Sequence, residues 1–289
     1  MRRRRTVGPR VVRWAAVMGL ALWQAPAWGQ QRPLVTEDPR TVGGGQVLVE
    51  LGVDWRRDIL FPVSGLRGDL LTAPAIGVSV GVGPIAEIQI DGSPYRRLRI
   101  TERSVAPLSA LVALDAREAT AVDDVVIATK LRLVNEGRGR PAIGVRFATR
   151  LPNASNESGL GHDTTDFFAS FLVGKTVGSL RLVANAGLAI VGDPVVAARQ
   201  DDLLTLGMSL ALALPKGVEL VSEYNGRLNV ADDTPRAGAE SRGVARGGLR
   251  FTRGPVRLDA AALFGATTTD LDIGATAGLT WTFTAFRMP

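Results

Sequence analysis

The stretch Ile273-Gly-Ala-Thr-Ala-Gly-Leu-Thr-Trp-Thr-Phe283 decides the fold of this chain. Its odd-numbered positions are all apolar, whereas its even-numbered positions hold only glycine and threonine. Successive side chains of a β-strand point to opposite faces, so the stretch predicts a strand with one apolar face and one small, polar face. A single strand of this kind also fits a soluble sandwich, and the prediction therefore depends on whether the pattern recurs.

The pattern does recur along the rest of the chain. Alternation of apolar and polar residues predicts strands at about 46–56, 76–82, 86–100, 127–133, 143–151, 166–173, 180–190, 204–214, 218–225, 246–251 and 256–264. In the third of these, we expect Leu98 and Ile100 to share a face with Ile88 and Ile90. With the closing stretch, the sequence predicts about twelve strands.

The connections between these strands alternate in length. Short ones at 83–84, 135–140, 175–178, 215–217 and 253–255 separate longer ones at 57–71, 101–124, 152–165, 191–203, 229–243 and 265–270. Short periplasmic turns and longer outside loops are typical of bacterial outer-membrane barrels. We therefore predict an all-β fold: an antiparallel transmembrane β-barrel of about twelve strands, with both termini periplasmic. A soluble β-sandwich is the alternative.

Charged residues within the predicted strands fall almost entirely on the face opposite the aliphatic one. A lysine or arginine facing lipid at the bilayer midplane costs about 2–4 kcal/mol, so we place the charged face in the lumen. Such a lining would set the selectivity of a pore; a ladder of ion pairs that only fills the bore is the structural alternative. The predicted pore-lining residues are Glu50, Asp54, Arg56, Glu87, Asp91, Lys130, Arg132, Arg146, Arg150, Arg181, Glu219, Glu223, Arg246, Arg250, Arg257 and Asp259.

The N-terminus has the composition of a secretory signal peptide. Six arginines precede an uncharged run from Trp14 to Trp23, and the segment closes on Ala27-Trp28-Gly29. We predict cleavage near Gly29 and a location in the bacterial outer membrane; an uncleaved anchor is the alternative, but the apolar run is shorter than the roughly 20 residues that span a bilayer. The predicted organisation is a signal peptide at 1–29, a periplasmic lead-in or plug at 30–44 and the barrel at 45–289.

Charge and cysteine content exclude several classes of function. The formal net charge is +6, and the six arginines of the predicted signal peptide account for all of it, so a nucleic-acid partner loses its electrostatic support. The chain has no cysteine and one histidine, which gives no basis for a metal site, and we expect no cofactor. The expected partners are outer-membrane lipid, a small-molecule solute and, during biogenesis, the barrel-assembly machinery.

Several segments resemble a family of exported bacterial proteins. They are Arg-Pro-Leu-Val-Thr-Glu-Asp-Pro at 32–39, Gly-Gly-Gln-Val-Leu-Val-Glu-Leu-Gly at 44–52, Ala-Thr-Lys-Leu-Arg at 128–132, Leu151-Pro152, the Gly/Asp/Thr-rich stretch 159–166 and the closing 276–283. That family is labelled as putative proteins of the meta-pathway of phenol degradation, and often as transporters. The resemblance implies an outer-membrane barrel linked to uptake of small, often aromatic compounds.

Two segments are candidates to fill the bore. One is the polar lead-in 30–44, and the other is Ser104–Asp115, where Leu108, Leu111, Val112 and Leu114 have helical spacing inside a long loop. The alternatives are a disordered lead-in and a loop that packs on the rim.

Three functions remain open from the sequence. The leading hypothesis is a channel for passive uptake of small molecules, aromatic or hydrophobic ones among them. On this hypothesis the protein is not an enzyme. The second is a structural or adhesive barrel with a closed bore. The third is a lipid-modifying enzyme that uses His162 beside Asp163; a loop histidine without a recognisable nucleophile motif is more often plain polar surface.

Overall fold

A computed structural model describes residues 32–113, 116–230 and 235–287. The predicted signal peptide, 1–29, lies outside the described residues, as does Leu114 of the loop with helical spacing. Within the described part of the chain, the helical elements are three single 3₁₀ turns, η1 (Ser109–Leu111), η2 (Asn156–Ser158) and η3 (Pro215–Gly217). No helix among these residues is both long and apolar enough to cross a membrane.

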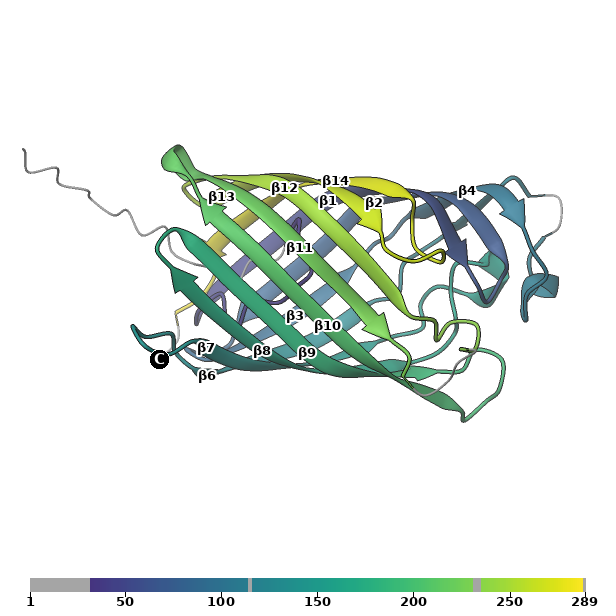
Figure 1. The fold of residues 1–289 in the computed structure, drawn as a ribbon, viewed down its shortest axis with the longest axis horizontal. Coiled ribbons are helices and arrows are strands. Elements are labelled where there is room, and N and C mark those ends of the chain that lie inside the picture. The colour runs from purple at the N-terminus through teal and green to yellow at the C-terminus, as the bar shows by residue number, and fades with distance from the viewer. Residues whose placement is uncertain (1–31, 114–115, 231–234, 288–289) are drawn as a thin grey trace, which may run out of the picture.

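The described chain forms one antiparallel sheet that closes on itself (Figure 1). Its strands are β1 (Gln46–Phe61), β2 (Leu66–Gly81), β3 (Ala86–Gly92), β4 (Arg96–Arg103), β5 (Glu118–Ala121), β6 (Val126–Val134), β7 (Ala142–Arg150), β8 (Asp166–Val177), β9 (Leu180–Gly192), β10 (Gln200–Ala213), β11 (Val218–Leu228), β12 (Arg242–Arg253), β13 (Val256–Gly265) and β14 (Ile273–Thr284). The strand that opened the sequence argument, β14, pairs with β1, and β1 also pairs with β2.

These fourteen segments occupy twelve positions around the wall. The strand β2 pairs with β3 along one half and with β4 along the other, so β3 and β4 share one position. In the same way β5 pairs with β4 and β6 pairs with β3. The predicted all-β antiparallel barrel of about twelve strands is therefore confirmed.

The two ends of the barrel differ in the length of their connections. One end, called the turn end, carries the short connections 82–85, 135–141, 178–179, 214–217 and 254–255. The first and last strands of the barrel also meet at the turn end, where Ala285 N donates to Gly45 O at 2.9 Å. The loop end carries 62–65, 104–117, 151–165, 193–199, 229–241 and 266–272. In Figure 1 the turn end lies at the left with the C-terminus, and the loop end lies at the right.

The predicted long connection at 57–71 is wrong. The strands β1 and β2 run on through this region and are joined by only Pro62–Gly65. Beyond the rest of the wall they present Ile59, Phe61, Leu66 and Leu70 to a buried cluster with Leu98 of β4, Ala119 of β5 and two loop residues, Val112 and Leu160. This apolar contact is what keeps the hairpin ordered where the sequence predicts a loop.

The predicted phase of Leu98 and Ile100 is also wrong. Leu98 is fully buried inside, whereas Ile88 and Ile90 face outward. Pro74 and Pro94 lie between the paired residues Thr72–Arg96 and Ile76–Gly92. Because neither proline has an N–H to donate, the hydrogen-bond ladder is interrupted at that level, and the alternation resumes with opposite phase.

From the sequence, the segment Ser104–Asp115 is a candidate to fill the bore or to pack on the rim. In its described part, 104–113, the helical spacing corresponds to the single turn η1, and Leu111 is half exposed there. Val112 packs against the buried cluster at the loop end. The described part of the segment therefore packs at the rim of the barrel.

Candidate functional site

The sixteen charged residues predicted to line the pore all lie on the inward phase of their strands. The outward positions between them are exposed aliphatic and aromatic side chains, such as Val53, Met208 and Trp281. Within the lumen Glu87 and Lys130 are fully buried, and Arg257 is 1% exposed.

Strand register brings many of these residues into ion pairs. The register sets Glu87 opposite Lys130, and their side chains pair at 2.9 Å. Other pairs are Glu223–Arg246 at 2.6 Å, Glu50–Arg257 at 3.0 Å and Glu219–Arg250 at 3.9 Å. Arg150 pairs with Asp166, and Arg132 donates to Pro84 O at the turn end. Much of the lining is thus a series of ion pairs; among the described residues Arg56, Asp91 and Arg132 take part in none of them.

The lead-in occupies the bore as a plug, defined here as residues 32–43. It follows the inside of the wall in a circuit that begins at β14 and ends at β2. Arg32 donates to Thr276 Oγ1 of β14 at 2.5 Å, and the backbone N–H groups of Val35 and Thr36 donate to Glu223 of β11 at 2.8 and 2.5 Å. Farther along, Val42 N donates to Glu87 of β3 at 2.7 Å.

Glycines on the inward face make room for the plug. A Cβ atom on Gly52 or Gly278 would lie 2.1 or 2.4 Å from the Arg32 side chain, and one on Gly81 would lie 1.7 Å from Gly43 O. Gly207 lies against Thr36, and Gly144 and Gly174 lie against Pro39. A larger residue at Gly52, Gly81 or Gly278 would displace the plug, so the glycines and threonines of β14 have a specific role as the surface that accommodates Arg32.

Ionic contacts fix the second half of the plug. Glu37 pairs with Lys130 at 3.2 Å and with Arg146 at 2.9 Å, and its backbone is held by two hydrogen bonds to Asn185. Asp38 accepts from Arg181 Nε at 2.9 Å and Nη2 at 2.6 Å, a two-point contact that is among the strongest hydrogen-bonded ion pairs. Sequence reasoning missed these plug residues because their partners come from distant strands.

The loop end is covered by a cap, which consists of the loop residues 62–65, 104–113, 116–117, 151–165, 229–230 and 235–241. Ser64 Oγ donates to Gly159 O at 2.8 Å, and Val112 and Leu160 close the buried cluster beneath. A Cβ atom on Gly238 would lie 3.3 Å from Val63 and 3.9 Å from His162. Four loops from different parts of the chain therefore touch one another over the mouth.

His162 sits in this cap, above a group of arginines. Burial, together with the charges of Arg150, Arg227, Arg242 and Arg96, lowers the pKa of His162 to about 3. Asp163, its sequence neighbour, is exposed. With cations as its charged neighbours, the imidazole is suited to a neutral structural contact in the cap and poorly suited to accept a proton as a general base.

Acidification should loosen the cap through His162. The unfolded histidine titrates near 6.5 and the folded one near 3, so the stabilisation is complete above pH 6.5 and is lost as the pH falls from 6.5 toward 3. Because the side chain is partly exposed, we expect a loss of the order of 1–2 kcal/mol at pH 5. Hydrogen exchange in 151–165, corrected for intrinsic rates, should quicken at pH 5 in the wild type and much less in His162→Gln; equal acceleration in both would exclude this histidine as the cause.

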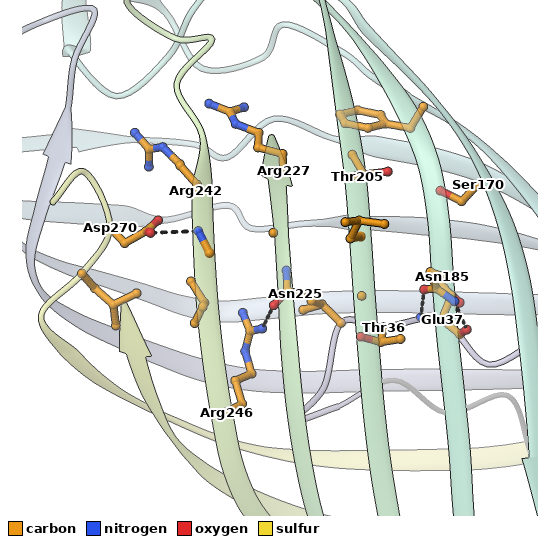
Figure 2. A pocket seen from close by; sticks show the side chains of 18 of the residues that line it. Thr36, Glu37, Ser170, Asn185, Thr205, Asn225, Arg227, Arg242, Arg246 and Asp270 are labelled. Atoms are coloured by element: carbon orange, nitrogen blue, oxygen red, sulfur yellow. Dashed lines mark hydrogen bonds between the residues drawn. The ribbon is translucent and has the colours of Figure 1, made fainter. Parts of the chain in front are cut away.

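Two cavities lie between the plug and the barrel wall. One has a volume of about 400 Å³ and the other about 330 Å³, and Val35, Arg56 and Arg246 line both. Figure 2 shows Arg227, Arg242 and Arg246 projecting from β11 and β12 on one side of the larger cavity, across from Glu37 and Asn185. Arg227 and Arg242 were not predicted from the sequence. Continuing the alternation of β11 and β12 to their loop ends would have found them.

No protein-family model and no curated protein matches the chain. Its fold is similar to the crystal structure of the COG4313 outer membrane channel from Pseudomonas putida F1, with a TM-score of 0.63 and 10% identity over 85% of this chain and 98% of that one. Weaker likenesses are to the translocator domain of autotransporter NalP from Neisseria meningitidis (TM-score 0.46, 12% identity, 82% and 88% covered) and to LpxR from Salmonella typhimurium (0.46, 8%, 82% and 100%). The first likeness establishes the fold alone: a closed antiparallel β-barrel.

Proposed function

We propose that this protein is an outer-membrane barrel that conducts small molecules passively through its bore. The turn end faces the periplasm, and the plug and the cap keep the resting bore closed. The observation that carries the proposal is a chamber beside the plug, lined by charged and apolar side chains, inside a wall whose outward positions are aliphatic. Lipid tolerates such an outer face, and a channel needs such an inner one. The predicted pore-lining residues would contribute the walls of this path.

Two features support conduction over catalysis. The chamber is lined by side chains from both the plug and the wall, and its volume lies in the range of small-molecule sites. The sole histidine is held neutral among arginines in the cap. The uptake of aromatic compounds that the family resemblance implies belongs to the same proposal, as does export behind a cleaved signal peptide.

A closed structural or adhesive barrel is the second candidate. The observation in its favour is the number of ion pairs that fix the plug, among them Glu37–Lys130, Asp38–Arg181 and Arg40–Glu136 at 2.7 Å. If the plug never moves, these contacts simply fill the bore and stabilise the wall.

Weakening the plug should distinguish the two. The variant Glu37→Ala/Asp38→Ala removes both carboxylates that hold the plug to β6, β7 and β9, so solute flux into proteoliposomes should rise severalfold over the wild type. The control is Asp163→Ala, which deletes an exposed loop carboxylate and should leave flux unchanged. Absence of any flux in the wild type and in the plug variant, with both folded, would establish the closed barrel.

A further inference from the structure

We propose that the larger cavity is a binding site for a small organic carboxylate, a substrate class that deepens the proposed function and rests on it. The cavity has the charge, the apolar surface and the size for a molecule with one carboxylate and an apolar body.

The charged residues that line the larger cavity are mostly cations. Five arginines line the cavity, namely Arg56, Arg146, Arg227, Arg242 and Arg246, against two acids, Glu37 and Asp270. Both acids already have hydrogen-bond or ion-pair partners. Glu37 pairs with Lys130 and Arg146, and one oxygen of Asp270 accepts from Gly243 N, Thr267 N and Thr267 Oγ1 at 2.9, 3.1 and 2.7 Å.

Two of the five arginines, Arg56 and Arg242, make no ion pair with a carboxylate among the described residues. Among the described residues Arg56 has no ion-pair or hydrogen-bond partner for its side chain, and its Nε is buried. Among the residues that the structure describes, Arg242 donates to Leu60 O alone, at 3.2 Å, and its Nε is also buried without a partner. The carboxylates of Glu240 and Asp270 act on Arg242 without forming an ion pair with it, and the like charge of Arg56 acts on both Arg242 and Arg246. A bound anion would offset this repulsion and would accept from the free donors of both guanidinium groups.

The neighbouring arginines are less available. Arg246 donates to Glu223 and Asn225. Arg227 is tied to two carbonyls of the cap, Glu240 O at 3.0 Å and Gly238 O at 2.7 Å, while the Glu240 carboxylate lies 3.9 Å away. The residues that would contact the carboxylate are therefore Arg56 and Arg242. Arg227 and Arg246, held by their own partners, add fixed positive charge beside them.

Apolar side chains complete the cavity. Ile59 and Phe168 line it from the wall, Leu271 lines it from the connection 266–272, and Val35 lines it from the plug. Val35 is 47% exposed, which is high for a valine inside a barrel and leaves its side chain open to a ligand. A hydrated inorganic anion gains nothing from these groups, whereas a carboxylate on an aromatic or aliphatic body buries apolar area against them.

Size agrees with this assignment. Small-molecule sites usually have volumes of roughly 300–1,000 Å³, and this cavity of about 400 Å³ lies near the lower limit. The occupant is thus a molecule of about the size of a single substituted ring. Bidentate contact from the planar guanidinium fork would orient its carboxylate toward β1 and β12.

Calorimetric titration of the full mature chain in detergent with benzoate and with benzamide tests the assignment. Benzamide keeps the shape of benzoate and removes the charge. The wild type should bind one benzoate and no measurable benzamide. Arg56→Gln and Arg242→Gln should each weaken benzoate binding by about tenfold or more, and Arg56→Lys should restore part of it. The matched control Arg253→Gln changes an exposed arginine at the turn end and should bind as the wild type does.

Four results would overturn the assignment: no benzoate binding, equal binding of benzamide, binding unchanged in both glutamine variants, or displacement of benzoate by equimolar sulfate. Heat modifiability on gels shows which variants are folded; if one glutamine variant does not fold, the other decides. Binding without flux would overturn the proposed channel and leave this site standing. Flux of neutral solutes without benzoate binding would overturn the carboxylate site and leave the proposed channel standing.

Discussion

Oxidised protein carrying Thr36→Cys and Gly207→Cys should conduct no solute, and reduction should restore the flux. A Cβ atom on Gly207 lies 3.5 Å from Thr36 Cβ, at the short end of the separations of about 3.5–4.5 Å found in disulfides. The bond would join the plug to β10 in the position that the structure shows. If solute passes only when the plug moves aside, this covalent link holds the bore closed. The chain has no cysteine of its own, so no other thiol competes.

Each single variant is the control for this experiment. Thr36→Cys and Gly207→Cys alone should conduct equally with and without reductant, because neither can form the link within one chain. Proteoliposome swelling with a small sugar, read before and after addition of reductant, measures the effect. Equal flux through the oxidised and reduced double variant would show that solute passes a stationary plug, and the plug would then be a permanent part of the channel wall.

The barrel could be predicted from sequence because its signal is local. Alternation along each strand, as in Ile273–Phe283, needs only an apolar surrounding and a polar lumen to be explained. The plug could not be derived in this way. Its contacts join Arg32 to Thr276 and Glu37 to Lys130 across long stretches of chain, and they depend on the width of the closed wall. The glycines of β14 were visible in the sequence, but their purpose appears only when Arg32 is seen against Gly278.

The errors at the loop end have a different cause. Within the bilayer, the aliphatic face of a strand points outward, and that rule places most strands correctly. The hairpin of β1 and β2 and the strand β4 project beyond the other strands, and there Leu66, Leu70 and Leu98 face inward while Arg97 pairs with Glu118 on the exposed side. In this projecting part the apolar side chains face the inner cluster and the charged ones face outward, which is the reverse of the alternation in the rest of the barrel and resembles a soluble protein. A single rule for all strands therefore assigned Leu98 to the wrong face.

Lys130→Met should destabilise the barrel by about 3–5 kcal/mol, the cost of breaking a buried ion pair from one side. Lys130 is fully buried between Glu87 of the wall, at 2.9 Å, and Glu37 of the plug, at 3.2 Å. Methionine fills similar space without a charge, so the effect reports the electrostatics. Glu37 would keep Arg146, but Glu87, also fully buried, would keep only neutral donors, Val42 N at 2.7 Å and Gln89 Nε2 at 2.8 Å.

Urea unfolding of the refolded barrel in micelles or vesicles, followed by tryptophan fluorescence, gives the free-energy difference. Lys216→Met is the matched control, since Lys216 is exposed in a turn, and it should change stability by less than about 0.5 kcal/mol. The double variant Lys130→Met/Glu87→Met should recover part of the loss, because it removes the stranded carboxylate together with its partner. If Lys130→Met is as stable as the wild type, the Glu87 carboxylate is not left as an uncompensated charge in that variant. The plug would then be held mainly by Asp38, Arg40 and the backbone contacts to Glu223.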